Sequence, residues 1–383
     1  MFLALRDLRF ATGRFALMGS VVALISLLLV MLSGLTAGLG GQNTAAIDRL
    51  GEQGVQRLVF GGAAGQEPTA SFTQSEFTVA QRDAWAATDG VASVEPLGVS
   101  QGRAIGLEHP VDTDPQGRAD VSGEPTTGVA TTAFIGLTPG GSDAPAGVEP
   151  GQIVLSQDVA DSLHAQEGDA VAVSGFVYTV ADVVPTEYYS HSPVTWLALE
   201  DWNAISHTAD DAVLGTAGLV RFDAGADVDA VAAAGDDAAG TVAETVKGSY
   251  AALPSYRSEN GSLMTMQGFL YGISALVVIA FLSIWTVQRT RDIAVLKALG
   301  GSNGWVLKDS IAQAAFVLVG GVAVGTGLAA VVGAFAGRAV PFELSWATTA
   351  VPAAGVLVLG MLAAVVAVYR VTRIDPLVAL GGN

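Results

Sequence analysis

Four long apolar stretches, unevenly spaced, dominate the pattern of hydrophobic and polar positions along the chain. One lies near the start, at residues 15–39, and three crowd the last third, at residues 263–287, 310–337 and 344–369. None of the four contains a charged residue, and each exceeds the roughly 20 apolar residues with which a helix crosses a bilayer core. The pattern therefore predicts a membrane protein with four transmembrane α-helices, one followed by three.

The polar stretch between the first two spans, residues 40–262, is long enough to form a domain with its own core. Its short apolar runs predict an inserted α+β domain. Ser156 is a suitable N-cap for a helix at residues 157–164, and residues 223–244, rich in alanine and aspartate, suggest a surface helix. The runs typical of strands are residues 94–97, 130–135, 152–155, 170–174 and 178–184. Two segments rich in Gly, Pro, Asp and Thr are predicted to be loops, residues 110–127 and 138–150.

The distribution of charge predicts the orientation. The chain has a formal net charge of −18, yet basic residues predominate at one set of span ends. They are Arg6, Arg9, Arg14, Arg289, Arg291, Lys297, Lys308, Arg370 and Arg373, against only Asp7, Asp292, Asp309 and Asp375. Because basic residues that flank spans stay in the cytoplasm, we expect a multi-pass plasma-membrane protein with both termini cytoplasmic and residues 40–262 extracytoplasmic.

The shorter segments complete this arrangement. Residues 1–14 combine apolar and basic side chains as an interfacial amphipathic helix does, resting on membrane lipid. Residues 288–309 connect the second and third spans in the cytoplasm, residues 338–343 form an outer loop, and residues 370–383 form a cytoplasmic tail. Small residues in the last two spans should let helices approach closely, within one chain or between two copies. They are Gly320, Gly321, Gly325, Gly327, Gly355 and Gly360.

The motifs of several enzyme classes are missing. The chain has no G-x-x-x-x-G-K-[ST] sequence to bind nucleotide phosphates and no H-E-x-x-H sequence to bind zinc. Four histidines are scattered without the spacing of metal ligands, so we expect them on the surface or in loops: His109, His164, His191 and His207. The acidic net charge argues against binding nucleic acid. We therefore expect no enzyme activity and no cofactor of the chain's own.

The segment R-T-R-D-I-A-V-L-K-A-L-G-G-S, residues 289–302, contains a short helical pattern ended by two glycines. Ile293, Leu296 and Leu299 would form its apolar face, while Asp292 and Lys297 would stay in water. Such a helix can dock into a groove of another protein. The alternative is a plain connecting turn.

This segment resembles the loop between the second and third spans of FtsX-like permeases, the MacB-type family of ABC transporters. The ending Y-R-V-T-R-I-D-P-L-V-A-L, residues 369–380, and the stretch at residues 151–184 resemble the same family. The resemblance implies a dimeric permease driven by a separate ABC ATPase subunit, which binds the ATP. Residues 289–302 would then couple the two subunits.

Within that family the chain is similar to the HrtB-type haem-exporter permeases, which implies haem as the substrate. Near the outer end of the second span stand Glu259, Met264, Met266 and Tyr271, and Glu343 precedes the last span. Met264 and Tyr271 are seven residues apart and share a helix face. The same spacing relates Glu259 to Met266. Methionine and tyrosine are known axial ligands of haem iron. The alternative is that the two glutamates lie in headgroup water and the methionines only pack.

Two other functions fit the same family. One is a transmembrane signal transmitter like the cell-division branch, in which ATPase cycles move the exterior domain. The other is a MacB-type extruder of lipoproteins or peptides. The size of the exterior domain and the short N-terminal segment disfavour the first of these.

Overall fold

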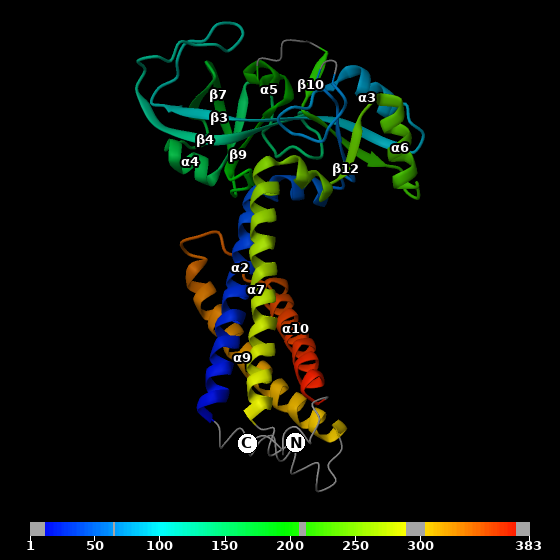
Figure 1. Ribbon diagram of the computed structural model, residues 1–383. Coiled ribbons are helices and arrows are strands. Elements are labelled where there is room, and N and C mark those ends of the chain that lie inside the picture. The colour runs from blue at the N-terminus through cyan, green and yellow to red at the C-terminus, as the bar shows by residue number, and fades with distance from the viewer. Residues whose placement is uncertain (1–11, 64–65, 207–211, 289–302, 373–383) are drawn as a thin grey trace. The chain divides into compact units, whose positions relative to one another are not determined.

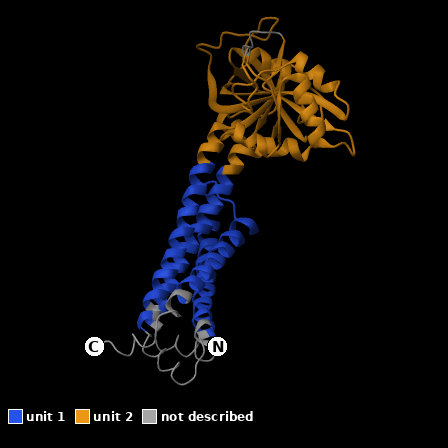
Figure 2. Cartoon of the chain, turned by 45° about the vertical axis from the view of Figure 1, so that its right-hand side comes forward, with its two compact units in different colours: residues 1–39, 260–383 blue, residues 40–259 orange. Residues whose placement is uncertain are grey.

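The computed structural model describes residues 12–63, 66–206, 212–288 and 303–372 (Figure 1). Most of the predicted interfacial helix and of the C-terminal tail falls outside these ranges. So do all five proposed coupling residues, Asp292, Ile293, Leu296, Lys297 and Leu299. The chain forms two compact units, one of residues 1–39 and 260–383 and the other of residues 40–259, coloured separately in Figure 2.

Four long helices form the first unit and continue, in two cases, into the second. They are α2 (Thr12–Glu52), α7 (Pro254–Gln288), α9 (Asn303–Ala336) and α10 (Trp346–Thr372). Each is long and apolar enough to cross a membrane, which confirms the prediction of one span followed by three. Both α2 and α7 extend well beyond the apolar stretches that predicted them, so that Glu259 lies inside α7.

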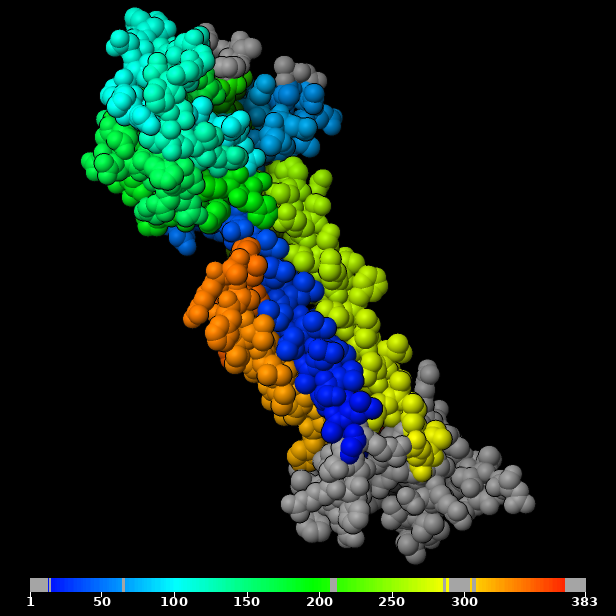
Figure 3. Space-filling model, turned by 90° about the vertical axis from the view of Figure 1, so that its left-hand side faces the viewer, coloured from blue at the N-terminus to red at the C-terminus, as the bar shows by residue number. Residues whose placement is uncertain are grey.

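Glycines bring the helices of this unit into close contact. A Cβ atom on Gly325 of α9 would lie 2.1 Å from the carbonyl oxygen of Ala23 in α2. One on Gly321 would lie 2.9 Å from the carbonyl oxygen of Gly19, one turn away. Figure 3 shows α9 (orange) lying directly against α2 (blue) on this side of the unit. By contrast, a Cβ on Gly327 would meet no atom within 4 Å.

The second unit is built on a ten-stranded sheet with an additional two-stranded sheet. The strands of the larger sheet are β1 (Arg57–Phe60), β3 (Val91–Leu107), β4 (Thr126–Leu137), β5 (Gln152–Ser156), β6 (Ala170–Val173), β7 (Phe176–Val184), β8 (Tyr188–Tyr189), β9 (Ser192–Ala198), β11 (Ala217–Phe222) and β12 (Val242–Thr245). The smaller sheet pairs β2 (Phe77–Thr78) with β10 (Val213–Gly215).

The larger sheet closes on itself in one part. Its strands run in the order β3-β4-β9-β5-β7-β6, and β6 pairs again with β3. The long strand β3 therefore joins three neighbours. Residues 91–97 pair with β11, residues 98–107 pair with β4, and residues 104–106 pair also with β6.

Helices cover the sheet and complete the cores of this unit. They are α3 (Val79–Ala86), α4 (Gln157–Leu163), α5 (Leu199–Ser206), α6 (Val228–Ala239) and the 3-10 helix η1 (Gly248–Ala252). Buried residues of α4 and α5, such as Leu163 and Trp202, share a core with the closed part of the sheet. At the other end, Trp85 of α3 packs with Val220 and Phe222 of β11.

The predicted α+β fold of this unit is confirmed, with some corrections. The strands and helix expected between residues 152 and 184 are present as β5, α4, β6 and β7. Ser156 stands at the N-cap of α4, but its hydroxyl makes no capping hydrogen bond. The helix expected over residues 223–244 is too long at both ends. It begins only at Val228, after its N-cap Asp227, and it ends before Gly240, which has a left-handed conformation and is followed by β12.

Candidate functional site

An apolar cavity of about 580 Å³ opens on the surface of the four-helix unit, and lining residues such as Met266 and Phe269 are 51% and 69% exposed. Its wall comes from two turns of α2, from α7, from the last residue of α9 and from the segment that follows α9. The lining residues are Leu28, Met31, Leu32, Leu35, Met266, Phe269, Leu270, Ala336, Val340 and Phe342. None of them is charged, and the volume lies within the range of about 300–1,000 Å³ that is usual for ligand pockets. We call this the bundle cavity.

Phe342 is fixed in the wall of the bundle cavity by two glycines. A Cβ atom on Gly34 of α2 would lie 2.3 Å from the Phe342 ring, and one on Gly333 of α9 would lie 2.5 Å from it. The next residue, Glu343, is bound to α2, because its N–H donates to the Gly34 carbonyl at 3.0 Å. The predicted outer loop therefore contributes an aromatic ring to the cavity.

The structure separates the four predicted site residues of this unit. Met266 lines the bundle cavity and Met264 does not, although the two side chains are similarly exposed, at 51% and 59%. Tyr271 packs against α10, where a Cβ atom on Gly355 would lie 2.9 Å from the tyrosine hydroxyl. Glu343 is exposed and follows the cavity residue Phe342. Of the four, only Met266 lines the described wall of this cavity.

Met31 was not predicted. It lies on the face of α2 that also carries Leu28, Leu32 and Leu35, which are three to four residues apart and so share one side of a helix. Together with Met266 it brings two thioether sulfurs to the wall of one cavity. The helical periodicity of α2 identifies this face, but the sequence alone does not tell which helix it meets.

Glu259 belongs to the second unit, where it is part of a polar cluster. His191 Nε2 lies 2.9 Å from both carboxylate oxygens of Glu259. The Asn43 side-chain amide donates to Glu259 Oε2 at 3.2 Å, and Ser255 Oγ donates to Asn43 Oδ1 at 2.7 Å. The side chains of His191 and Glu259 are 31% and 39% exposed, so water still reaches this pair.

A tight turn presents His191 to the glutamate. Ser190 and His191 form the two-residue connection between β8 and β9, and both have positive φ, at 48° and 63°. Such angles are typical of the turns that match strand twist in two-residue hairpins. The N–H groups of Ser190 and His191 donate to the carbonyls of Asn43 and Gln42. His191 is thus a turn histidine, as expected, but its pairing with Glu259 was not predicted because no local spacing relates two residues so far apart.

Comparison with known proteins identifies the family. Residues 264–376 match the family described as "FtsX-like permease C-terminal". The C-terminal region of this chain is that of an FtsX-like permease. The match covers α7, α9 and α10, and it confirms the family indicated by the resemblance of three segments. The permease is a multi-pass membrane protein of the ABC transporter class and not a catalytic subunit, so ATP hydrolysis belongs to a partner.

Three relatives illustrate how far the similarity extends. The permease is 21% identical over 385 residues to the "Putative hemin transport system permease protein HrtB" of Staphylococcus epidermidis, with 100% of both chains covered. The protein of that name from Staphylococcus haemolyticus is 28% identical over 130 residues, which cover 34% of this chain and 37% of that one. The "Uncharacterized ABC transporter permease YknZ" of Bacillus subtilis is 29% identical over 126 residues, or 31% of each chain.

Two solved structures align with part of the chain. The extracellular domain of YknZ, a noncanonic ABC-type transporter from Gram-positive bacteria, covers 49% of this chain and 95% of its own, with a TM-score of 0.31 and 13% identity. The periplasmic region of MacB from Actinobacillus actinomycetemcomitans covers 50% of this chain and 89% of its own, with a TM-score of 0.33 and 10% identity.

Proposed function

We propose that this permease exports haem, using ATP that a separate ABC ATPase subunit hydrolyses. The observation that carries the proposal is the bundle cavity, which is uncharged and walled by aliphatic, aromatic and thioether groups. Haem is a planar, largely apolar molecule that favours such a wall over water. The staphylococcal relatives that align with the permease are named as hemin transport permeases, which supports the same substrate.

Met31 and Met266 are the best candidates to approach the haem iron, because both line the bundle cavity and methionine sulfur is a known axial ligand. Of the haem-binding residues expected from the sequence, only Met266 lines the described wall of the bundle cavity. Met264 and Tyr271 would act from other faces of α7. Glu343 would offer a carboxylate beside Phe342, and Glu259, already paired with His191, would act from the second unit.

The arrangement in the membrane follows from the charge pattern. We expect both termini in the cytoplasm, residues 40–262 outside, and the ATPase docked on the segment that contains Ile293, Leu296 and Leu299. A second copy of the permease would pack on α7. Only 17% of the apolar window of this helix is buried, against 33% to 44% for the other three. A Cβ atom on Gly268 or Gly272 of α7 would meet no atom within 4 Å, which leaves room for another helix.

Haem binding by the purified permease in lipid nanodiscs, followed by absorbance, tests the proposal. We expect Met266→Leu to weaken binding by about tenfold or more, equivalent to about 1.4 kcal/mol, and to shift the haem spectrum if the sulfur is a ligand. Met264→Leu, two residues away on the same helix but outside the cavity, is the matched control and should bind as the parent does.

Three further variants locate the other contacts. Met31→Leu should behave like Met266→Leu, whereas Tyr271→Phe and Glu259→Ala should change binding only if those side chains reach the haem. A parent protein that shows no haem-dependent spectrum would contradict the proposed substrate. Equal binding by Met266→Leu, Met31→Leu and the parent would contradict the proposed site.

A further inference from the structure

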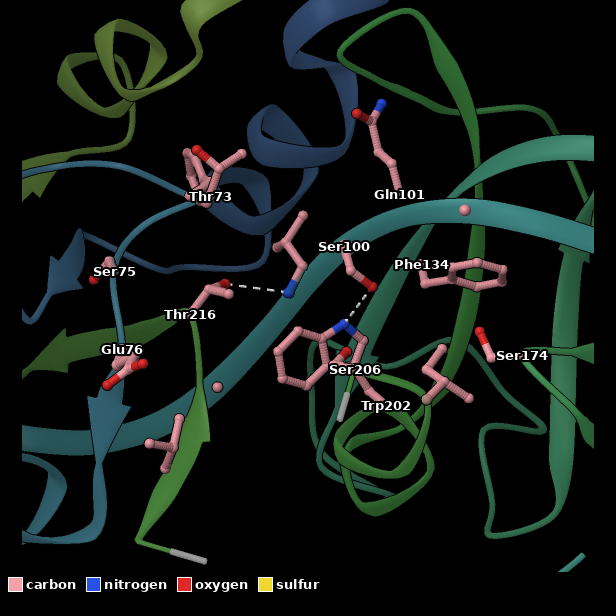
Figure 4. Close-up of a pocket in the computed structure, with 16 residues that line it drawn as sticks. Thr73, Ser75, Glu76, Ser100, Gln101, Phe134, Ser174, Trp202, Ser206 and Thr216 are labelled. Carbon is pink, nitrogen blue, oxygen red and sulfur yellow. Dashed lines mark hydrogen bonds between the residues drawn. The ribbon is translucent and has the colours of Figure 1, made fainter. Parts of the chain in front are cut away.

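The second unit, residues 40–259, is called the inserted unit from here on. A second cavity, of about 450 Å³, lies in it at the middle of β3 (Figure 4). We call it the β3 cavity. It is lined by Phe72, Thr73, Ser75, Glu76, Val99, Ser100, Gln101, Gly102, Phe134, Ser174, Trp202, Ile205, Ser206, Val213, Gly215 and Thr216. Four of these residues are consecutive in β3, so the strand itself forms part of the wall.

The β3 cavity opens where β3 lacks a neighbouring strand. On one edge β3 pairs with β4 over residues 98–107. On its other side, pairing with β11 ends at Leu97 and pairing with β6 begins at Ala104. Within the described part of the chain, no strand pairs with residues 98–103 on that second edge. A stretch of strand edge is therefore left open between two paired stretches.

Hydrogen bonds at the end of β11 show which main-chain groups point to the open edge. The Thr216 N–H donates to the Leu97 carbonyl at 2.8 Å, and the Val99 N–H donates to the Thr216 hydroxyl at 3.1 Å. Alternate residues of an antiparallel strand turn their main-chain groups to the same edge. The N–H and C=O of Gln101 and the N–H of Arg103 thus face the gap, while Ser100 and Gly102 face β4.

Both ends of the open edge are closed by turns of the chain. At one end, pairing with β11 stops at Ala217, and the hydroxyl of the preceding residue, Thr216, accepts the Val99 N–H. Figure 4 shows Thr216 beside the strand. At the other end β6 turns into β7 through Ser174 and Gly175, both with positive φ, at 50° and 83°. Only a short extended segment fits between them, since each residue of a strand advances about 3.3 Å.

The floor and the charge of the β3 cavity restrict the ligand further. Trp202 lies beside the strand and donates its indole N–H to the Ser100 hydroxyl at 3.0 Å (Figure 4). Glu76 is the single charged residue of the described lining. The site therefore offers alternating main-chain donors and acceptors, an aromatic floor and one carboxylate.

We propose that the β3 cavity binds a short extended peptide segment of a partner protein, which adds as a strand to the open edge of β3 and places a cationic group near Glu76. Peptides recognised in this way gain affinity from main-chain hydrogen bonds and specificity from the side-chain pockets. The proposal concerns a partner of the inserted unit and does not depend on haem as the substrate.

Amide hydrogen exchange of the full-length permease in nanodiscs, resolved to single residues, tests the strand addition. The probe is the acetylated and amidated pentapeptide Thr-Val-Lys-Val-Thr at millimolar concentration. Each new hydrogen bond should slow exchange about fivefold or more at Gln101 and Arg103, with no change at Ser100 and Gly102. The same peptide with N-methylated valines should give no protection. Unchanged exchange at both Gln101 and Arg103, or equal slowing at all four residues, would overturn the proposal.

A variant pair tests the role of Glu76. Partly exposed ion pairs contribute little, so Glu76→Gln should weaken binding of the lysine peptide by about two- to fivefold. The same variant should leave binding of a peptide with alanine in place of lysine unchanged. Equal affinity of the parent and Glu76→Gln for the lysine peptide would overturn the cationic requirement.

Discussion

The two units of this permease differ in the contacts that stabilise each of them internally. In the four-helix unit, helices meet through glycines that allow backbones to touch, as Gly325 does against Ala23, and the cavity between them is apolar. In the inserted unit, strands distant in sequence are joined by pairing and by polar side chains, such as Arg221 with the buried Asp143. Both units have apolar cores, but close glycine contacts are a feature of the first and a buried ion pair is a feature of the second.

The two units should also differ in the side of the membrane from which they are accessible, as the charge pattern predicts. Because the chain has no cysteine, single cysteines report their own accessibility. Thr113 is exposed in the inserted unit, so Thr113→Cys should react with an impermeant maleimide in intact cells. Ser302→Cys should react only after lysis. Labelling of Ser302→Cys in intact cells would contradict the orientation expected from the charge pattern.

The largest stability effect is expected at the buried ion pair of the inserted unit. The Asp143 and Arg221 side chains are only 5% and 18% exposed. Asp143→Asn would leave the Arg221 charge without its partner, which should lower the free energy of unfolding by about 3–5 kcal/mol. Asp83→Asn breaks the exposed pair with Arg82 and should cost less than about 1 kcal/mol. Equal unfolding midpoints for the two variants would show that the inserted unit does not depend on this pair.

In the four-helix unit, close packing at a glycine is tested by a variant that adds a single methyl group. Gly325→Ala places a Cβ atom against the backbone of α2 and should destabilise the protein by about 1–3 kcal/mol through overpacking. Gly327→Ala is the matched control, because its Cβ would meet no atom within 4 Å and alanine favours a helix. Thermal unfolding of the two proteins in the same detergent measures the difference. If both variants unfold like the parent, close packing at Gly325 is not what holds α9 to α2.

These two regions were also unequally predictable. The four spans follow from hydropathy alone, because a bilayer imposes the same requirement on every helix that crosses it. Local signals likewise identified β5, α4, β6 and β7, whose neighbours in space are mostly neighbours in sequence. Asp143 lies in a segment expected to be a loop, and nothing local indicates that it is buried against Arg221.

The candidate site shows the same division. Helical periodicity placed Met266 on a defined face of α7, but it could not tell that Met31 lines the same cavity or that Tyr271 turns toward α10. The pairing of His191 with Glu259 and the open edge of β3 depend on contacts between segments far apart in the chain. Such non-local pairing is set by the whole fold.

The smallest effect concerns pH and should be confined to the inserted unit. Burial raises the pKa of the Asp201 carboxyl above its ordinary value of 3.8, although the hydrogen bond from the Gly151 N–H opposes the shift. The folded protein thus holds a proton that the unfolded chain releases. The resulting stabilisation is complete below the ordinary pKa and is lost as pH rises through the folded pKa.

Asp201→Asn keeps an oxygen that can accept from Gly151 and removes the titration. Its unfolding midpoint should therefore fall less than that of the parent as pH rises from about 3 to 6. Since the carboxyl is partly exposed and screened by water, the difference should stay below about 1 kcal/mol. The same pH dependence in both proteins would show that Asp201 is not the responsible group.

Haem export is tested most directly in proteoliposomes that contain the permease, its ATPase subunit and membrane-dissolved haem. With ATP, we expect haem to pass to an acceptor protein on the side of the inserted unit, and we expect Met266→Leu to slow this transfer while Met264→Leu does not. ATP hydrolysis that leaves the haem in the membrane, with the parent and both variants alike, would contradict haem export by this permease.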